Sequence, residues 1–126
     1  MIHDQDWLMR EIEAFLNLVA REAFKKDKIE YRIVDEDNLT ETDSLHKKLI
    51  ALLEKGEICE AEDLLFDKID VSNEAYIELA LDFYQRVNGL SEKRLIESNF
   101  SRPEIVEGMA ETLKKYGVDF VVPPED

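Results

Sequence analysis

Residues 42–69 read TDSLHKKLIALLEKGEICEAEDLLFDKI, and this stretch decides the fold class. Apolar residues recur at steps of three and four on each side of Gly56. Such spacing places them on one face of an α-helix. The stretch therefore predicts two antiparallel helices joined by a tight turn at the glycine. Their predicted inner faces carry Leu45, Leu49, Leu52 and Leu53 before the turn, and Ile58, Ala61, Leu64, Leu65 and Ile69 after it.

The N-terminal part of the chain predicts another amphipathic helix, over residues 4–26. Acidic residues stand at its start and basic residues at its end, the order that complements a helix dipole. Its apolar residues extend beyond the stripe that one neighbour would cover. We therefore expect a second contact, either within the chain or with another copy. The main stripe comprises Leu8, Ile12, Phe15, Leu16, Val19 and Ala23, and Trp7, Leu18, Ala20 and Phe24 lie beside it.

The C-terminal half predicts three further helical segments. Residues 72–87 are apolar on almost every side, which is typical of a central buried helix, with Ser72 as its predicted N-cap and Gly89 after its end. A short helical turn is expected to begin at Ser91. The last helix is predicted to start at a capping box formed by Ser101 and Glu104 and to stop at Gly117.

Two short segments have a β-like pattern. Residues 29–34 alternate apolar and polar side chains, and residues 118–122 are rich in β-branched and aromatic residues. If both are strands, they are expected to pair with each other. The predicted fold is therefore all-α, with about five helices in antiparallel hairpins and this minor β pairing. One domain is expected over residues 1–122, with residues 123–126 as a frayed tail.

The charge of the chain disfavours several classes of partner. Its 126 residues include 30 acidic and 16 basic side chains, for a formal charge of −14. Nucleic acid and anionic membranes would be repelled. The acidic excess is spread over both halves of the chain, apart from a cluster at residues 35–43. The one specific partner that the charge suggests is a basic protein that docks on this cluster. The start of the chain lacks a signal-peptide pattern, and no apolar run reaches bilayer length, so we expect a cytoplasmic location.

Motifs for catalysis, cofactors and metals are not recognisable. The glycines are isolated and form no phosphate-binding loop. Cys59 is the single cysteine and has acidic neighbours, which disfavours a reactive thiolate. A calcium loop starting at Asp35 would place Thr40 and His46 where glycine and glutamate are required, so residues 35–38 are interpreted as a solvated turn. His3 and His46 are interpreted as exposed. No cofactor or metal is expected.

Two resemblances arise from these packing motifs. Residues 52–61, LLEKGEICEA, resemble the centre of one tetratricopeptide repeat, although no second copy follows. Residues 6–13, the hairpin at 56–61, residues 89–96 and residues 110–113 together resemble a family of small helical proteins of Gram-positive bacteria. Residues 29–42 depart from that pattern. The resemblance implies a helical architecture and a bacterial cytosolic setting. It implies no site residue, because the family has no established activity.

Two functional hypotheses follow from the residues. The first is a non-enzymatic protein that interacts with other proteins or forms a homodimer through its N-terminal helix; the alternative buries both apolar faces of that helix within one monomer. The residues proposed for this interface are Trp7, Phe15, Leu18 and Phe24. The second hypothesis is a small-ligand-binding protein or enzyme with a pocket between helices. The polar side chains available for that pocket are Tyr31, His46, Tyr76, Tyr84 and Arg86.

Overall fold

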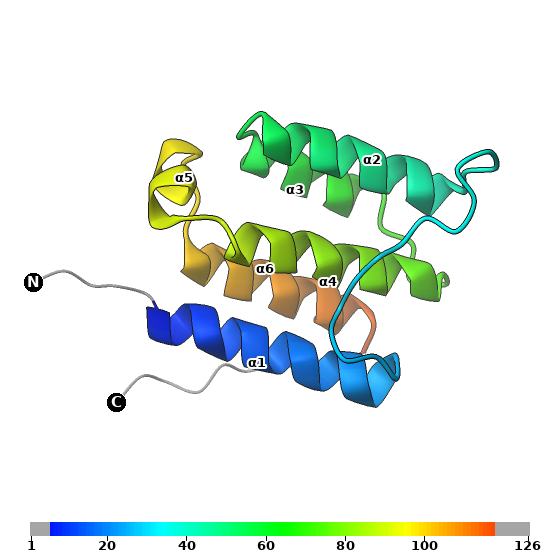
Figure 1. The fold of residues 1–126 in the computed structure, drawn as a ribbon, viewed down its shortest axis with the longest axis horizontal. Helices are drawn as coiled ribbons and strands as arrows, with labels where there is room; N and C mark the ends of the chain where they lie inside the picture. Colours follow the sequence, from blue (N-terminus) through cyan, green and yellow to red (C-terminus); the bar gives the residue numbers. More distant parts are fainter. Residues whose placement is uncertain (1–5, 118–126) are drawn as a thin grey trace, which may run out of the picture.

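The computed structural model describes residues 6–117, which form six α-helices and no strand (Figure 1). The prediction of an all-α fold is confirmed. The count is six because the short turn expected after Ser91 is a helix of its own. The helices are α1 (Asp6–Ala23), α2 (Glu41–Glu54), α3 (Ile58–Asp67), α4 (Glu74–Asn88), α5 (Glu92–Glu97) and α6 (Arg102–Lys115). Residues 123–126, predicted as a tail, lie outside the described residues.

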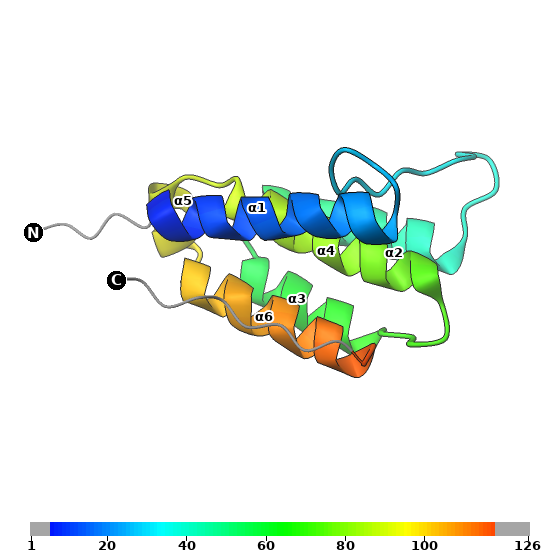
Figure 2. The same ribbon diagram turned by 90° about the horizontal axis from the view of Figure 1, so that it is seen from below.

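The helices form two layers, and α4 lies in the middle of the first (Figures 1 and 2). Helices α1, α4 and α2 lie side by side, and α6 and α3 form a second layer against them (Figures 1 and 2). Helix α4 contacts α1, α2 and α6. Nine of its residues are buried, among them Leu79, Phe83 and Tyr84. The prediction of a central buried helix is therefore confirmed, although the helix begins at Glu74, two residues later than predicted, and ends at Asn88.

The hairpin predicted at Gly56 is present as α2 and α3, which pack against each other. Gly56 has a φ of +77°, a conformation that favours glycine because it has no Cβ. The Glu57 amide donates to the Leu52 carbonyl at 2.9 Å, and the Gly56 amide donates to the Leu53 carbonyl at 3.0 Å. This pair of bonds is a Schellman motif, which ends α2 and turns the chain. The likeness of the hairpin to a tetratricopeptide repeat stays a prediction.

Helix α1 ends three residues earlier than the predicted Lys26. The chain reverses at Lys25, which has a φ of 57°, and the Lys26 amide donates to the Ala20 carbonyl at 3.0 Å. The buried stripe also differs from the prediction, because Ala20 is buried and Ala23 is exposed. The residues that α1 buries are Leu8, Ile12, Leu16 and Ala20, four residues apart along one face.

Residues 24–40 cross from α1 to α2 as an irregular segment. Residues 29–34 form no strand, and their predicted partner, residues 118–122, lies outside the described residues. The alternation in the sequence has another cause, because Ile29 and Tyr31 face the core. Side chains of α4 make the hydrogen bonds to this backbone that a neighbouring strand would otherwise make. Gln85 Nε2 donates to the Ile29 carbonyl at 2.6 Å, and Asp82 Oδ1 accepts from the Tyr31 amide at 3.1 Å.

The predicted caps are confirmed at one helix and wrong at another. Glu104 accepts from the Ser101 amide at 2.8 Å, as expected of the capping box at α6. At α4 the N-cap is Asn73, whose side chain accepts from the Ala75 amide at 3.0 Å. Ser72 is not the cap, because its hydroxyl donates to Asp70 at 2.6 Å.

Candidate functional site

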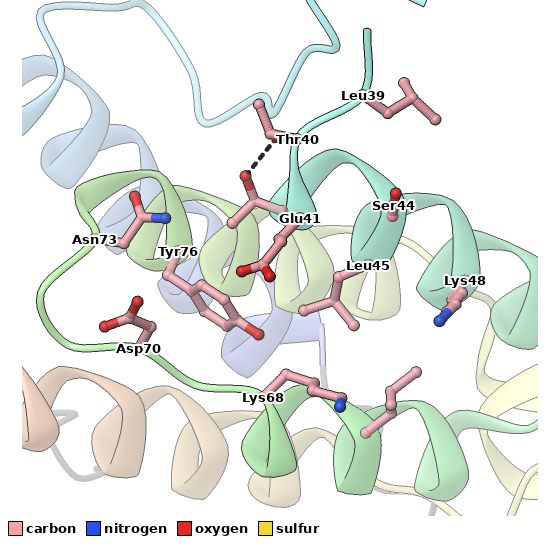
Figure 3. Close-up of a pocket in the computed structure, with 12 residues that line it drawn as sticks. Leu39, Thr40, Glu41, Ser44, Leu45, Lys48, Lys68, Asp70, Asn73 and Tyr76 are labelled. Carbon is pink, nitrogen blue, oxygen red and sulfur yellow. Dashed lines mark hydrogen bonds between the residues drawn. The ribbon is translucent and has the colours of Figure 1, made fainter.

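The candidate site is a groove of about 450 Å³ between the N-terminal ends of α2 and α4 and the C-terminal half of α3 (Figure 3). Its apolar surface comes from Leu39, Leu45 and Leu64. Its remaining lining is polar or charged and comprises Thr40, Glu41, Thr42, Ser44, Lys48, Lys68, Asp70, Asn73 and Tyr76. The groove therefore combines an apolar surface with charged groups of both signs.

One wall of the groove is the capped first turn of α2. The Thr40 hydroxyl accepts from the Asp43 amide at 3.1 Å, and Asp43 accepts from the Thr40 amide at 3.1 Å. The Tyr31 hydroxyl donates to Asp43 Oδ1 at 2.6 Å and lies 2.9 Å from Thr42 Oγ1. The Tyr31 hydrogen bond lowers the pKa of Asp43, which keeps that carboxylate ionised. The irregular segment thus holds the first turn of α2 in place.

Tyr76 from α4 provides the most unusual group in the groove. Its side chain is 5% exposed, yet its hydroxyl has no hydrogen-bond partner among residues 6–117. Figure 3 shows the ring extending toward the middle of the groove, beside Glu41. Burial raises the pKa of Tyr76 to about 12, with smaller contributions from Tyr116, Asp70 and Glu41. The hydroxyl is therefore a neutral group, available to donate or accept a hydrogen bond.

The charged rim has two acidic and two basic side chains. Asp70 Oδ1 accepts from the Ser72 amide at 3.0 Å and from the Ser72 hydroxyl, and these bonds lower the pKa of Asp70. Within the described residues, Glu41, Lys48 and Lys68 form no ion pair. Figure 3 shows Glu41 and Asp70 around Tyr76, with Lys48 at the opposite end of the groove.

A buried polar cluster behind the groove centres on Asp82 of α4. Its Oδ1 accepts from the Tyr31 amide, and its Oδ2 lies 2.7 Å from Arg86 Nε and 3.8 Å from His46 Nδ1. The Tyr31 and His46 rings lie 4.9 Å apart. His46 is therefore mostly covered, which corrects the sequence-based interpretation of an exposed histidine. Tyr31 covers it because residues 24–40 fold back over α2 and α4.

His46 makes the stability of this cluster depend on pH. Burial lowers the pKa of His46 below its usual 6.5, although the Asp82 carboxylate opposes the shift. The unfolded chain then binds a proton more readily than the folded one, so this contribution to stability is present above about pH 6.5 and is lost as the pH falls. Urea titrations at about pH 7.5 and about pH 5 are expected to show a smaller acid-induced loss for His46→Gln than for the parent. An equal loss in both proteins would contradict this assignment.

The residues proposed for a pocket between helices divide into three places. Tyr31, His46 and Arg86 meet at Asp82, and Tyr76 lies in the groove. Tyr84 belongs to neither site. It is fully buried, and its hydroxyl donates to Glu62 Oε2 at 2.6 Å. Burial raises the pKa values of both Tyr84 and Glu62.

The residues proposed for a self-association surface are only partly exposed. Trp7, Phe15 and Phe24 pack against the core with part of their surface, whereas Leu18 is 48% exposed. Trp7 and Leu18 are 11 residues apart, about three helical turns, and so lie on the same side of α1. Phe24 follows the end of the helix and lies outside this strip.

Sequence reasoning missed the groove and the role of Asp82. The pattern Thr-x-x-Asp at residues 40–43 is a capping-box signal that marks the start of α2 and can be read in the sequence. Asp82, the one acidic residue among the otherwise apolar residues 79–84, was a second signal. No local pattern in the sequence indicated that α2, α3 and α4 meet around Tyr76.

Residues 6–117 contain neither a metal-binding cluster nor a membrane-spanning helix. No group of three His, Cys, Asp or Glu side chains is close enough there to hold a metal ion. No helix in that range is both long and apolar enough to cross a membrane. Cys59 is exposed, and partial burial and nearby carboxylates, including Glu104, raise the pKa of its thiol. His3 lies outside the described residues.

These features define an all-helical protein in which a helical hairpin packs on a central buried helix and forms an open groove with it. The chain belongs to a family of unknown function (DUF6483), whose family model matches residues 2–117. Neither the search of curated proteins nor the search of solved structures found a match. The predicted membership of a family without an established activity is thus supported, and the predicted Gram-positive origin stays a prediction.

Proposed function

We propose that this protein is a non-enzymatic binding module whose groove between α2, α3 and α4 docks a segment of a partner protein. The observation that carries the proposal is Tyr76, whose side chain is 5% exposed and directs into the groove a hydroxyl that forms no hydrogen bond among residues 6–117 (Figure 3). This hydroxyl reaches the surface of the groove, where a ligand that enters the groove can hydrogen-bond to it.

The rim of the groove favours a polypeptide as the occupant. Leu39 on one side is 40% exposed, and Val71, next to the lining residue Asp70, is 57% exposed. These side chains extend the apolar surface beyond the groove, where a longer segment would cover them. The groove volume also falls within the range of small-molecule sites, roughly 300–1,000 Å³. A small ligand, bound by a carrier or an enzyme, is therefore the alternative occupant.

The docking groove is tested by selecting a random peptide library on the immobilised 126-residue protein. Selected peptides are expected to bind Leu39→Glu at least about tenfold more weakly than the parent, a loss of about 1.4 kcal/mol, because a charge would replace the apolar rim. Ile96→Glu is the matched control, since Ile96 is 74% exposed on α5 and does not line the groove. Peptides that bind Leu39→Glu and the parent equally, or a selection without enrichment, would contradict the proposal.

We also propose, as a second function, self-association through the strip of α1 that carries Trp7, Phe15 and Leu18. The partial exposure of these large apolar side chains favours it, because a second copy would complete their burial. The two functions use different surfaces, so both can hold.

Sedimentation equilibrium tests the self-association. The parent is expected to have the mass of a dimer, and Trp7→Ala and Leu18→Glu are expected to shift it toward the monomer. Val34→Glu is the control, because Val34 is exposed and lies outside α1. If Trp7→Ala and Leu18→Glu sediment with the same mass as the parent, the interface is not on this strip.

A further inference from the structure

We infer that the end of the groove formed by Tyr76, Glu41 and Asp70 binds a basic side chain, lysine or arginine, of the partner segment. This inference rests on the proposed docking function and adds the chemistry of the occupant. A protonated amine or guanidinium group would donate hydrogen bonds to the Tyr76 hydroxyl oxygen and to the two carboxylates. Donors of this kind form the stronger, charge-assisted hydrogen bonds.

The burial and direction of Tyr76 support this assignment. Its hydroxyl is directed toward the middle of the groove beside Glu41 (Figure 3). Burial is the largest cause of the raised pKa of Tyr76, and the carboxylates of Asp70, Glu41 and Asp67 raise it further. These negative charges near the hydroxyl favour a positive ligand group over a negative one.

The two carboxylates retain their negative charge for a ligand. Asp70 accepts hydrogen bonds from the neutral Ser72, which keep it ionised, and within residues 6–117 neither Glu41 nor Asp70 forms an ion pair. Tyr116, which follows the end of α6, donates to the Asp70 carbonyl at 3.0 Å, and this bond holds the loop before α4 near the groove. Asp70 is thus held in place before a ligand arrives.

The lysines of the groove give the bound segment a direction. Lys48 lies at the end opposite Tyr76, and Lys68 lines the groove just after the end of α3 (Figure 3). A basic side chain at the Tyr76 end and a polar or acidic one near Lys48 would match this order of charges. The formal charge of −14 would also speed the approach of a basic segment.

The test repeats the peptide selection on the double variant Glu41→Gln with Asp70→Asn. Peptides selected on the parent are expected to share a lysine or arginine at one position and to bind this variant about tenfold more weakly, since hydrogen bonds to charged groups contribute about 1.5–3 kcal/mol. Replacing that lysine by norleucine is expected to weaken binding to the parent and not to the double variant. The control is Glu107→Gln with Glu111→Gln, two exposed acids of α6 that change the net charge equally.

The outcomes separate the two proposals. Peptides that depend on Leu39 but share no basic residue, or share an acidic one, would overturn this inference and leave the docking groove in place. An equal loss of binding in the control would also overturn it, because net charge alone would explain the effect. Peptides that do not depend on Leu39 would contradict the docking groove itself. A basic residue whose effect disappears in the double variant would support both.

Discussion

Arg102→Met is expected to lower the free energy of unfolding by about 4 kcal/mol, within the range for breaking a buried ionic network. Arg102 is buried at the start of α6, where its guanidinium group contacts Glu92 and donates to three acceptors on Asn88 and Leu90. Asn88 in turn donates to the Met9 carbonyl at 3.0 Å. One side chain therefore connects α4 with α5 and α6, and through Asn88 with α1.

The cost arises because methionine fills much of the same volume but donates no hydrogen bond. The Asn88 and Leu90 carbonyl oxygens, which accept from Arg102 at 2.9 Å each, would lose this donor. Urea unfolding measures the loss, and Arg94→Met is the control. Arg94 is an exposed residue of α5 with one long contact, 3.4 Å to the Leu53 carbonyl, so a change below about 1 kcal/mol is expected there. Equal losses for both variants would show that the network contributes little.

Gly108→Ala is expected to destabilise the protein by about 3 kcal/mol, at the upper end of overpacking costs. A Cβ at Gly108 would lie 2.1 Å from the Tyr84 hydroxyl oxygen and 2.4 Å from the ring carbon that carries it. Tyr84 is fully buried and cannot move without leaving the core or breaking its bond to Glu62. At a solvent-exposed position within a helix, replacing glycine by alanine would stabilise the protein, because alanine is the better helix former.

Gly89→Ala is the matched control for that prediction. Its added Cβ would meet only ordinary contacts, the nearest at 3.5 Å, and its backbone φ of −81° suits any residue. We expect its stability to stay within about 1 kcal/mol of the parent or to rise. Thermal and urea unfolding of both variants provide the comparison. A stable Gly108→Ala protein would show that α4 and α6 can separate at this contact.

Much of the helical architecture was predictable because its signals are local. Gly56 marks the hairpin turn, Ser101 and Glu104 mark the start of α6, and the apolar residues of α4 identify the central helix. The errors arose where a distant partner decided the outcome. The alternation of apolar and polar residues around Tyr31 predicted a strand. Instead, the Tyr31 amide donates a hydrogen bond to Asp82, 51 residues later, and the segment lies over α2 and α4 without forming a strand.

The candidate site was less predictable than the fold. Tyr76, His46 and Arg86 were identified as polar side chains near a pocket, but the sequence could not divide them between the groove and the Asp82 cluster. Their assignment depends on how residues 24–40 fold over α2 and α4. Glu41, Lys48 and Asp70 went unnoticed because acidic and basic residues are common in this chain and no spacing distinguishes these three.

The sequence by itself determined the helices, most of their ends and the central place of α4, because periodicity and capping act between residues that are close along the chain. Only the tertiary structure decided that Gly108 must accommodate Tyr84, that Arg102 joins the ends of four helices, and that Tyr76 faces a groove without a hydrogen-bond partner among residues 6–117. These outcomes depend on packing between residues far apart along the chain, and hydrophobic periodicity carries no information about which distant side chains meet.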